Sequence, residues 1–158
     1  MKILIVHNSN YGNGEKLAQT LGEALKKGND ITVEHIKNLS PEDVAKDVPD
    51  AIIVGSYIKA FMISMKSKTW LSSVRSSLKK ANKTIKYGAA FLTHALPPDK
   101  AMSWRNRLVK KLQKGNVISN VYPECLSGQV GDVKGPFKDG VLDDITAKAA
   151  EIVEWMKK

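Results

Sequence analysis

Short runs of apolar residues alternate along this chain with longer stretches in which apolar residues recur every three or four positions. The short runs have the length of strands, and the longer stretches have the period of a helix that buries one face. The runs lie at residues 3–6, 51–55, 87–92 and 117–118, and the near alternation of apolar residues at 31–36 suits an edge strand. The helical stretches lie at residues 17–25, 70–78, 101–112 and 142–156, with a short helix expected after Ser40-Pro41. Strands that alternate with helices in this way predict a parallel sheet covered on both faces.

The central runs are apolar at every position, as strands buried on both faces require. Right-handed crossovers leave only a few doubly wound topologies for such a chain. We therefore expect an α/β fold with three layers, a doubly wound five-stranded parallel sheet of order 2-1-3-4-5, as a single domain over residues 1–158. The glycine-rich stretch 123–136 is expected to interrupt the last strand. Ligands in such folds bind beyond the carboxyl ends of the strands at the switch point, so the loops after Val6, Gly55 and Leu92 are the expected site.

The loop after the first strand consists of small and polar residues and leads into a helix. It contains Ser9, Asn10, Tyr11, Gly12, Asn13 and Gly14. Backbone amides at a helix N-terminus can converge on a phosphate, and the loop contains no lysine or arginine before Lys16, which suits a bound monophosphate. The loop lacks the Gly-x-x-x-x-Gly-Lys-Ser/Thr and Gly-x-Gly-x-x-Gly patterns of nucleotide-binding loops, and the strand ends lack the acids of a response-regulator receiver.

This loop resembles the phosphate loop of flavodoxins, which runs Ser/Thr-x-Thr-Gly-x-Thr. Ser9, Gly12 and Asn13 fit that pattern, whereas Tyr11 stands where a small hydroxyl residue is usual and Gly14 replaces a threonine. Gly14 thus removes one hydroxyl from the implied phosphate site. The resemblance covers nearly the whole chain and implies a flavodoxin-like protein that binds FMN.

The other two loops extend the resemblance to the flavodoxin-like family. The second loop implies flavin contacts from Ser56, Tyr57, Ile58, Lys59 and Ala60, and the third from Thr93, His94 and Ala95. Tyr57 and Phe61 are the aromatic residues expected to stack on the ring, with core packing the alternative for Phe61. Flavodoxins often place a tyrosine where this chain has His94, for which a surface position is the alternative. We assign no catalytic residue and no metal ligand.

Positive charge is concentrated in the middle of the chain. Between Lys59 and Lys114, fourteen lysines and arginines face a single acid, Asp99, and the whole chain has a net charge of +9. The helices after strands 3 and 4 are expected to share one face of the sheet and to carry these cations. Such a face predicts an acidic redox partner or an anionic membrane surface. Nucleic acid is not expected, because no aromatic platform accompanies the charge.

The resemblance implies electron transfer through FMN between redox partners. A related group, the menaquinone-dependent protoporphyrinogen oxidases, makes an FMN-dependent oxidoreductase acting on a quinone or porphyrinogen the alternative, and a flavin-free binding module stays open. No apolar run reaches the roughly 20 residues of a membrane span, and the lone Cys125 cannot form an internal disulfide. We therefore expect a cytoplasmic protein.

Overall fold

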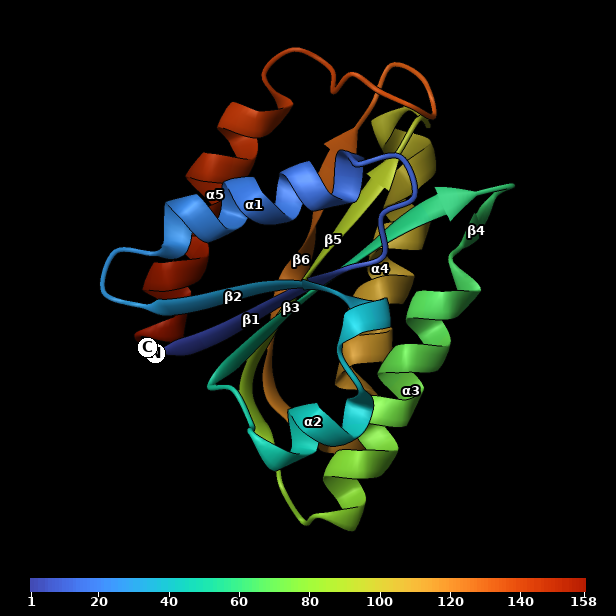
Figure 1. Ribbon diagram of the computed structural model, residues 1–158. Coiled ribbons are helices and arrows are strands. Elements are labelled where there is room, and N and C mark those ends of the chain that lie inside the picture. Colours follow the sequence, from blue (N-terminus) through green and yellow to red (C-terminus); the bar gives the residue numbers. More distant parts are fainter.

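The computed structural model describes residues 1–158, and its elements alternate as the sequence predicts (Figure 1). They are β1 (Lys2–His7), α1 (Asn13–Leu25), β2 (Asp30–His35), α2 (Pro41–Lys46), β3 (Ala51–Lys59), β4 (Met62–Ile63), α3 (Met65–Lys80), β5 (Ile85–His94), α4 (Pro98–Gln113), β6 (Ile118–Gln129) and α5 (Val141–Met156). Two single 3₁₀ turns, Ile36–Asn38 and Lys114–Asn116, follow β2 and α4. No helix combines the length and the apolar composition that crossing a membrane requires.

The sheet has the predicted topology. Its parallel strands lie in the order β2-β1-β3-β5-β6, which is 2-1-3-4-5 when only the parallel strands are numbered. The prediction of five strands omitted a sixth, β4, which pairs antiparallel with the end of β3 as a short hairpin. β1 and β3 are adjacent at the centre of the sheet. From β1 the strand order continues to β2 on one side, and from β3 it continues to β5 and β6 on the other side. The carboxyl ends of β1 and β3 therefore form the switch point.

Helices cover both faces of the sheet and create two cores (Figure 1). Leu4, Val6 and Ile52 point toward α2, α3 and α4, whereas Ile3 and Ile5 point toward α1 and α5. Because successive side chains of a strand point to opposite faces, a strand between two cores is apolar at every position. The two basic helices, α3 and α4, share one face, as predicted.

The last strand is longer than predicted. β6 continues to Gln129, and the expected interruption at residues 123–136 is wrong for its first part. Gly88 of β5 pairs with Val121, and the next paired position, Ala90, is opposite Cys125, so β6 accommodates two extra residues as a bulge. Pro123 lies within this irregular part of an edge strand, where the missing N–H breaks no ladder. The glycine-rich loop begins only after Gln129.

Candidate functional site

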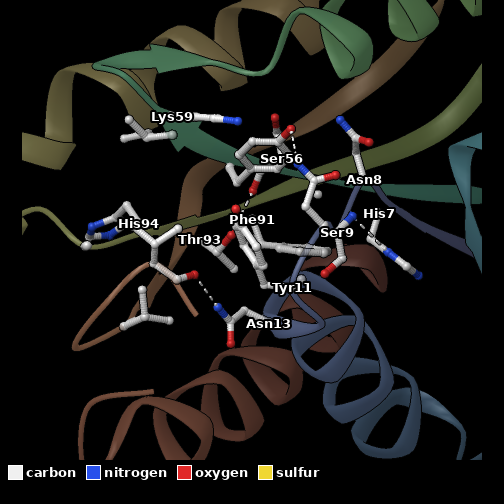
Figure 2. Close-up of a pocket in the computed structure, with 18 of the residues that line it drawn as sticks. His7, Asn8, Ser9, Tyr11, Asn13, Ser56, Lys59, Phe91, Thr93 and His94 are labelled. Atoms are coloured by element: carbon white, nitrogen blue, oxygen red, sulfur yellow. Dashed lines mark hydrogen bonds between the residues drawn. The ribbon is translucent and has the colours of Figure 1, made fainter. Parts of the chain in front are cut away.

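A cavity opens at the carboxyl ends of β1, β3 and β5, where the topology places a ligand site (Figure 2). The structure brings to its wall every residue predicted to contact the flavin except Gly12 and Phe61. These are Ser9, Asn10, Tyr11, Asn13, Gly14, Ser56, Tyr57, Ile58, Lys59, Ala60, Thr93, His94 and Ala95. Three loops far apart in the sequence therefore meet around one space.

The start of α1 offers unpaired N–H groups to this cavity. Gly12 makes the turn into the helix with a φ of 90°, and its N–H donates to the Ser9 hydroxyl oxygen at 2.9 Å. The first helical hydrogen bond runs from the Lys16 N–H to the Gly12 carbonyl. No side chain caps the helix, and the N–H groups of residues 13–15 find no acceptor in the chain. With the helix dipole, these groups form an anion-binding arrangement.

Hydrogen bonds fix the first two loops against each other. The Asn10 amide donates to the Tyr57 hydroxyl at 2.9 Å, and the buried Asn8 amide donates to the Ser64 hydroxyl at 2.7 Å. The hydroxyls of Ser56 and Ser67 are 2.5 Å apart. The second loop is thus held to both the first loop and the start of α3, which orders the cavity wall before any ligand arrives.

His94 belongs to the cavity wall, and the alternative of a surface position is wrong because its side chain is buried. Its Nδ1 lies 2.9 Å from the Leu96 carbonyl oxygen and its Nε2 lies 2.8 Å from the Ser127 hydroxyl. A carbonyl only accepts, so Nδ1 carries the proton and Nε2 accepts from the serine. Burial, helped by the charge of Arg105 and opposed by the Leu96 carbonyl, lowers the pKa of His94, which keeps the ring neutral near pH 7.

Phe61 does not take either of the positions that the sequence suggested. Phe61 lies at the turn between β3 and β4, is 72% exposed to solvent and does not line the cavity. Tyr57 does line it. The expectation of two stacking aromatics therefore reduces to one, because the unpredicted hairpin carries Phe61 away from the strand ends.

The cavity also has residues that the sequence analysis missed, namely His7, Asn8, Gly55, Phe91, Val130 and Val133. The last two come from the loop after β6, which is tied to α1 by a 3.1 Å hydrogen bond from the Asn13 amide to the Val133 carbonyl (Figure 2). Phe91 lies across Gly55 on the neighbouring strand. A glycine inside a buried strand signals such a close approach, so this contact was detectable in the sequence.

His7 at the end of β1 contacts His35, which lies far from it in the sequence. The rings of His7 and His35 meet edge to face with centroids 5.0 Å apart. The His7 Nδ1 accepts from the Ser9 N–H at 3.3 Å, which helps to shape the first loop. Burial, together with the nearby His35, lowers the pKa of His7. Both rings therefore support the first loop, since the His35 Nε2 also lies 3.2 Å from the Ser9 carbonyl oxygen.

The charge at the site is positive. Lys59 is the only lysine, arginine or acid among the cavity-lining residues. The ion pairs of the chain involve Lys2, Lys26, Lys148 and Lys157, and none involves a cation from residues 59–114. An anionic group in the cavity thus meets no acid, and the basic residues of this stretch keep their charge uncompensated.

A doubly wound sheet with a cavity at its switch point, bounded by a polar loop and an aromatic one, defines a small-ligand-binding α/β protein. Comparison with solved structures shows that the fold is flavodoxin-like. An archaeal flavodoxin superposes with a TM-score of 0.70 at 18% identity over 100% of both chains. A WrbA-like flavodoxin from Agrobacterium tumefaciens gives the same score and identity over 99% of this chain and 97% of its own.

In sequence, the chain is similar to a protein named NAD(P)H dehydrogenase (quinone) from Brucella anthropi. The two are 27% identical over 114 residues, which is 60% of this chain and 57% of the relative. The chain thus matches little more than half the length of that curated relative. No family model matches the chain.

Proposed function

We propose that this protein binds FMN in the cavity and transfers electrons between redox partners. The observation that carries the proposal is the set of unpaired N–H groups at the start of α1, at one end of a cavity that has Tyr57, Ile58 and Ala95 elsewhere on its wall. A phosphate needs the first feature and a flat apolar ring needs the second. FMN carries both groups in one molecule.

The chain's own residues divide the work of binding. The amides of residues 13–15 donate to the phosphate, and the Ser9 hydroxyl keeps its hydrogen for the same purpose, since its oxygen already accepts from Gly12. Tyr57 and the neutral His94 border the ring, and the loop containing Val133 limits access of water. When bound, FMN supplies the redox chemistry. Lys59 favours negative charge on the reduced ring.

We place the contact with a redox partner on the basic face of residues 59–114. Its uncompensated cations favour an acidic protein or an anionic membrane surface, and no nucleic acid is proposed. A second candidate function, reduction of a quinone by the FMN-loaded protein, is favoured by the name of the Brucella anthropi relative. A porphyrinogen is the other substrate class for such an enzyme.

Flavin titration tests the proposal. The purified protein, freed of bound flavin, is titrated with FMN and separately with riboflavin, and quenching of flavin fluorescence gives each Kd. We expect FMN to bind at least tenfold more tightly, which corresponds to about 1.4 kcal/mol from the phosphate. Ser9→Ala should weaken FMN binding but leave riboflavin binding unchanged, and Ser103→Ala, an exposed change on α4, is the matched control. Failure of FMN to bind would refute the proposal.

Turnover separates the two functions. The FMN-loaded protein is mixed with NADH or NADPH and the quinone menadione, and nicotinamide oxidation is followed at 340 nm. A carrier should oxidise little of the nicotinamide, whereas an oxidoreductase should oxidise many molecules of NADH or NADPH per bound flavin. Sustained turnover would support the quinone enzyme over the carrier.

A further inference from the structure

Four large apolar side chains gather on the surface beside the cavity. They are Phe61, Met62, Met65 and Met102, which are 72%, 49%, 58% and 47% exposed and which we call the hairpin patch. Met62 belongs to β4, Met65 begins α3, and Met102 lies on α4, which contacts β4. Single exposed apolar residues are ordinary, but several on adjoining elements indicate an interaction surface.

The two residues at the tip of the hairpin have the left-handed backbone that a two-residue hairpin turn requires, and neither is the glycine or asparagine that is usual there. Ala60 and Phe61 have φ values of 50° and 57°, in the left-handed region that bulky residues avoid. The Phe61 side chain packs against no core, so its burial does not offset this strain. Figure 1 shows the β3–β4 hairpin projecting past the ends of the other strands. A phenylalanine that is exposed at a turn position normally taken by glycine or asparagine is available for recognition.

The hairpin patch is continuous with the cavity. Lys59 and Ala60 line the cavity and directly precede Phe61 in the chain. Lys59 also pairs with Met62 across the hairpin. A molecule docked on the patch therefore lies next to whatever the cavity holds.

Lysines lie close to the patch residues along the chain, and we call them the lysine rim. Lys59 pairs with Met62, Lys66 and Lys68 follow Met65, and Lys100 precedes Met102. None of these four lysines takes part in an ion pair. Asp99 is the one acid nearby in the sequence. An apolar centre with an uncompensated positive rim is complementary to a protein surface with an apolar centre and an acidic rim.

Two other occupants fit less well. A second copy of this chain would bring the lysine rims together, and that repulsion opposes a symmetric dimer. Elements that insert into a membrane surface carry tryptophan, phenylalanine or leucine, whereas three of the four patch residues are methionines, whose flexible thioethers suit adaptable protein contacts.

We propose that the hairpin patch and its lysine rim dock an acidic redox protein beside the cavity. This inference rests on the proposed function, because it assumes that FMN occupies the cavity. In the docked complex one electron leaves the reduced metal centre of the partner and enters FMN, so that the partner is oxidised and the flavin reduced.

Stopped-flow kinetics test the docking. The probe is a photoreduced plant-type [2Fe–2S] ferredoxin, which is acidic and strongly reducing, and flavin reduction in the FMN-loaded protein gives the second-order rate constant. We expect this constant to fall about tenfold or more between 20 and 500 mM salt. Lys66→Glu/Lys100→Glu should lower it about tenfold at low salt, and Phe61→Ser should lower it severalfold with the salt dependence kept.

A matched control has the same net charge as Lys66→Glu/Lys100→Glu. Lys27→Glu/Lys158→Glu reverses two exposed lysines, in the loop after α1 and at the C-terminus, and Figure 1 shows both segments on the side of the molecule away from β4. This variant should change the rate constant less than twofold. Equal effects of the two double variants, or no effect of Phe61→Ser, would overturn the inference. Loss of FMN binding in the unmutated protein would instead refute the proposed function, and the fluorescence titration detects it separately.

Two further measurements exclude the other occupants. Sedimentation with vesicles of 70% phosphatidylcholine and 30% phosphatidylglycerol should be the same for Phe61→Ser and the unmutated protein. Analytical ultracentrifugation should give the same mass for both. Release from vesicles by Phe61→Ser, with ferredoxin kinetics unchanged, would replace the protein partner with a membrane. Dissociation of a dimer by Phe61→Ser would replace it with a second copy of this chain.

Discussion

Replacing Gly55 with alanine should push Phe91 out of its position beneath the cavity. The two residues are paired across β3 and β5, and the Phe91 ring lies over the space that a side chain at position 55 would occupy. A Cβ on Gly55 would lie 1.9 Å from Cζ, 2.2 Å from Cε2 and 2.6 Å from Cε1 of that ring. Carbon atoms make contact at about 3.5 Å, so the ring must move by roughly 1.5 Å.

The ring has little freedom to make that movement. Phe91 is 0% exposed and packs in the core beneath α1 and α5. Overpacking of a filled core costs about 1–3 kcal/mol, and a clash with three ring atoms belongs at the upper end of that range, about 3 kcal/mol. With a urea m-value of about 1.5–2 kcal/mol/M, the unfolding midpoint should fall by about 1.5–2 M. The direction open to the ring is the cavity, so FMN binding should weaken as well.

Urea unfolding of the flavin-free protein, followed by far-UV circular dichroism, measures this change. Gly131→Ala is the matched control, because the nearest atom to its Cβ, the Pro136 carbonyl oxygen, is 3.8 Å away, and its effect should stay within about 0.5 kcal/mol. Gly55→Ala combined with Phe91→Leu should be more stable than the sum of the single changes predicts, because the smaller side chain relieves the clash. An unchanged midpoint for Gly55→Ala, or strict additivity in the double variant, would show that the Phe91 ring does not clash with a side chain at position 55.

Three other changes test the site. Gly14→Thr restores the hydroxyl that flavodoxin loops carry, with its Cβ at an allowed 3.4 Å from the Ser9 Cβ, and should strengthen FMN binding about fivefold in the fluorescence titration. Lys59→Gln removes the one cation of the cavity wall and should lower the flavin redox potential by about 40 mV. This shift corresponds to roughly 1 kcal/mol, the interaction of the lysine with the negative charge of the reduced ring at about 8 Å and an effective dielectric near 40. The unfolding free energy should fall as the pH drops below about 6.5. The lowered pKa values of His7 and His94 mean that the unfolded chain binds more protons than the folded protein in this range. His94→Asn should reduce that fall, which urea titrations at pH 7 and pH 5 measure.

Each of these expectations has an opposing outcome. Weaker FMN binding by Gly14→Thr would mean that Ser9 needs the space beside the glycine. A potential that stays constant or rises in Lys59→Gln would remove the lysine from the redox site, and Lys27→Gln serves as its control. Greater stability at pH 5 than at pH 7 would contradict the prediction that the fold favours the neutral forms of His7 and His94.

Local sequence patterns determined most of the fold. A strand buried on both faces must be apolar at each position, and a helix that covers it must repeat its apolar residues every three or four positions, so the element order and the sheet order could be predicted. The three loops followed from that order, because parallel strands bring their carboxyl ends to one edge. Ser9, Ser56 and Thr93 thus reach one cavity although they lie far apart in the chain.

Features that depend on contacts between distant segments could not be predicted from local patterns. Pro123 and its neighbours remain in β6 because β5 offers a partner that tolerates a bulge, and no local signal reports that partner. Val133 reaches the cavity through its contact with Asn13, 120 positions earlier in the chain. The β3–β4 hairpin turned Phe61 outward, since pairing of Lys59 with Met62 fixes the side of the strand on which the turn projects. Sequence periodicity records which face of an element is buried, but pairing energies across the fold determine where an edge strand ends and where a loop folds back.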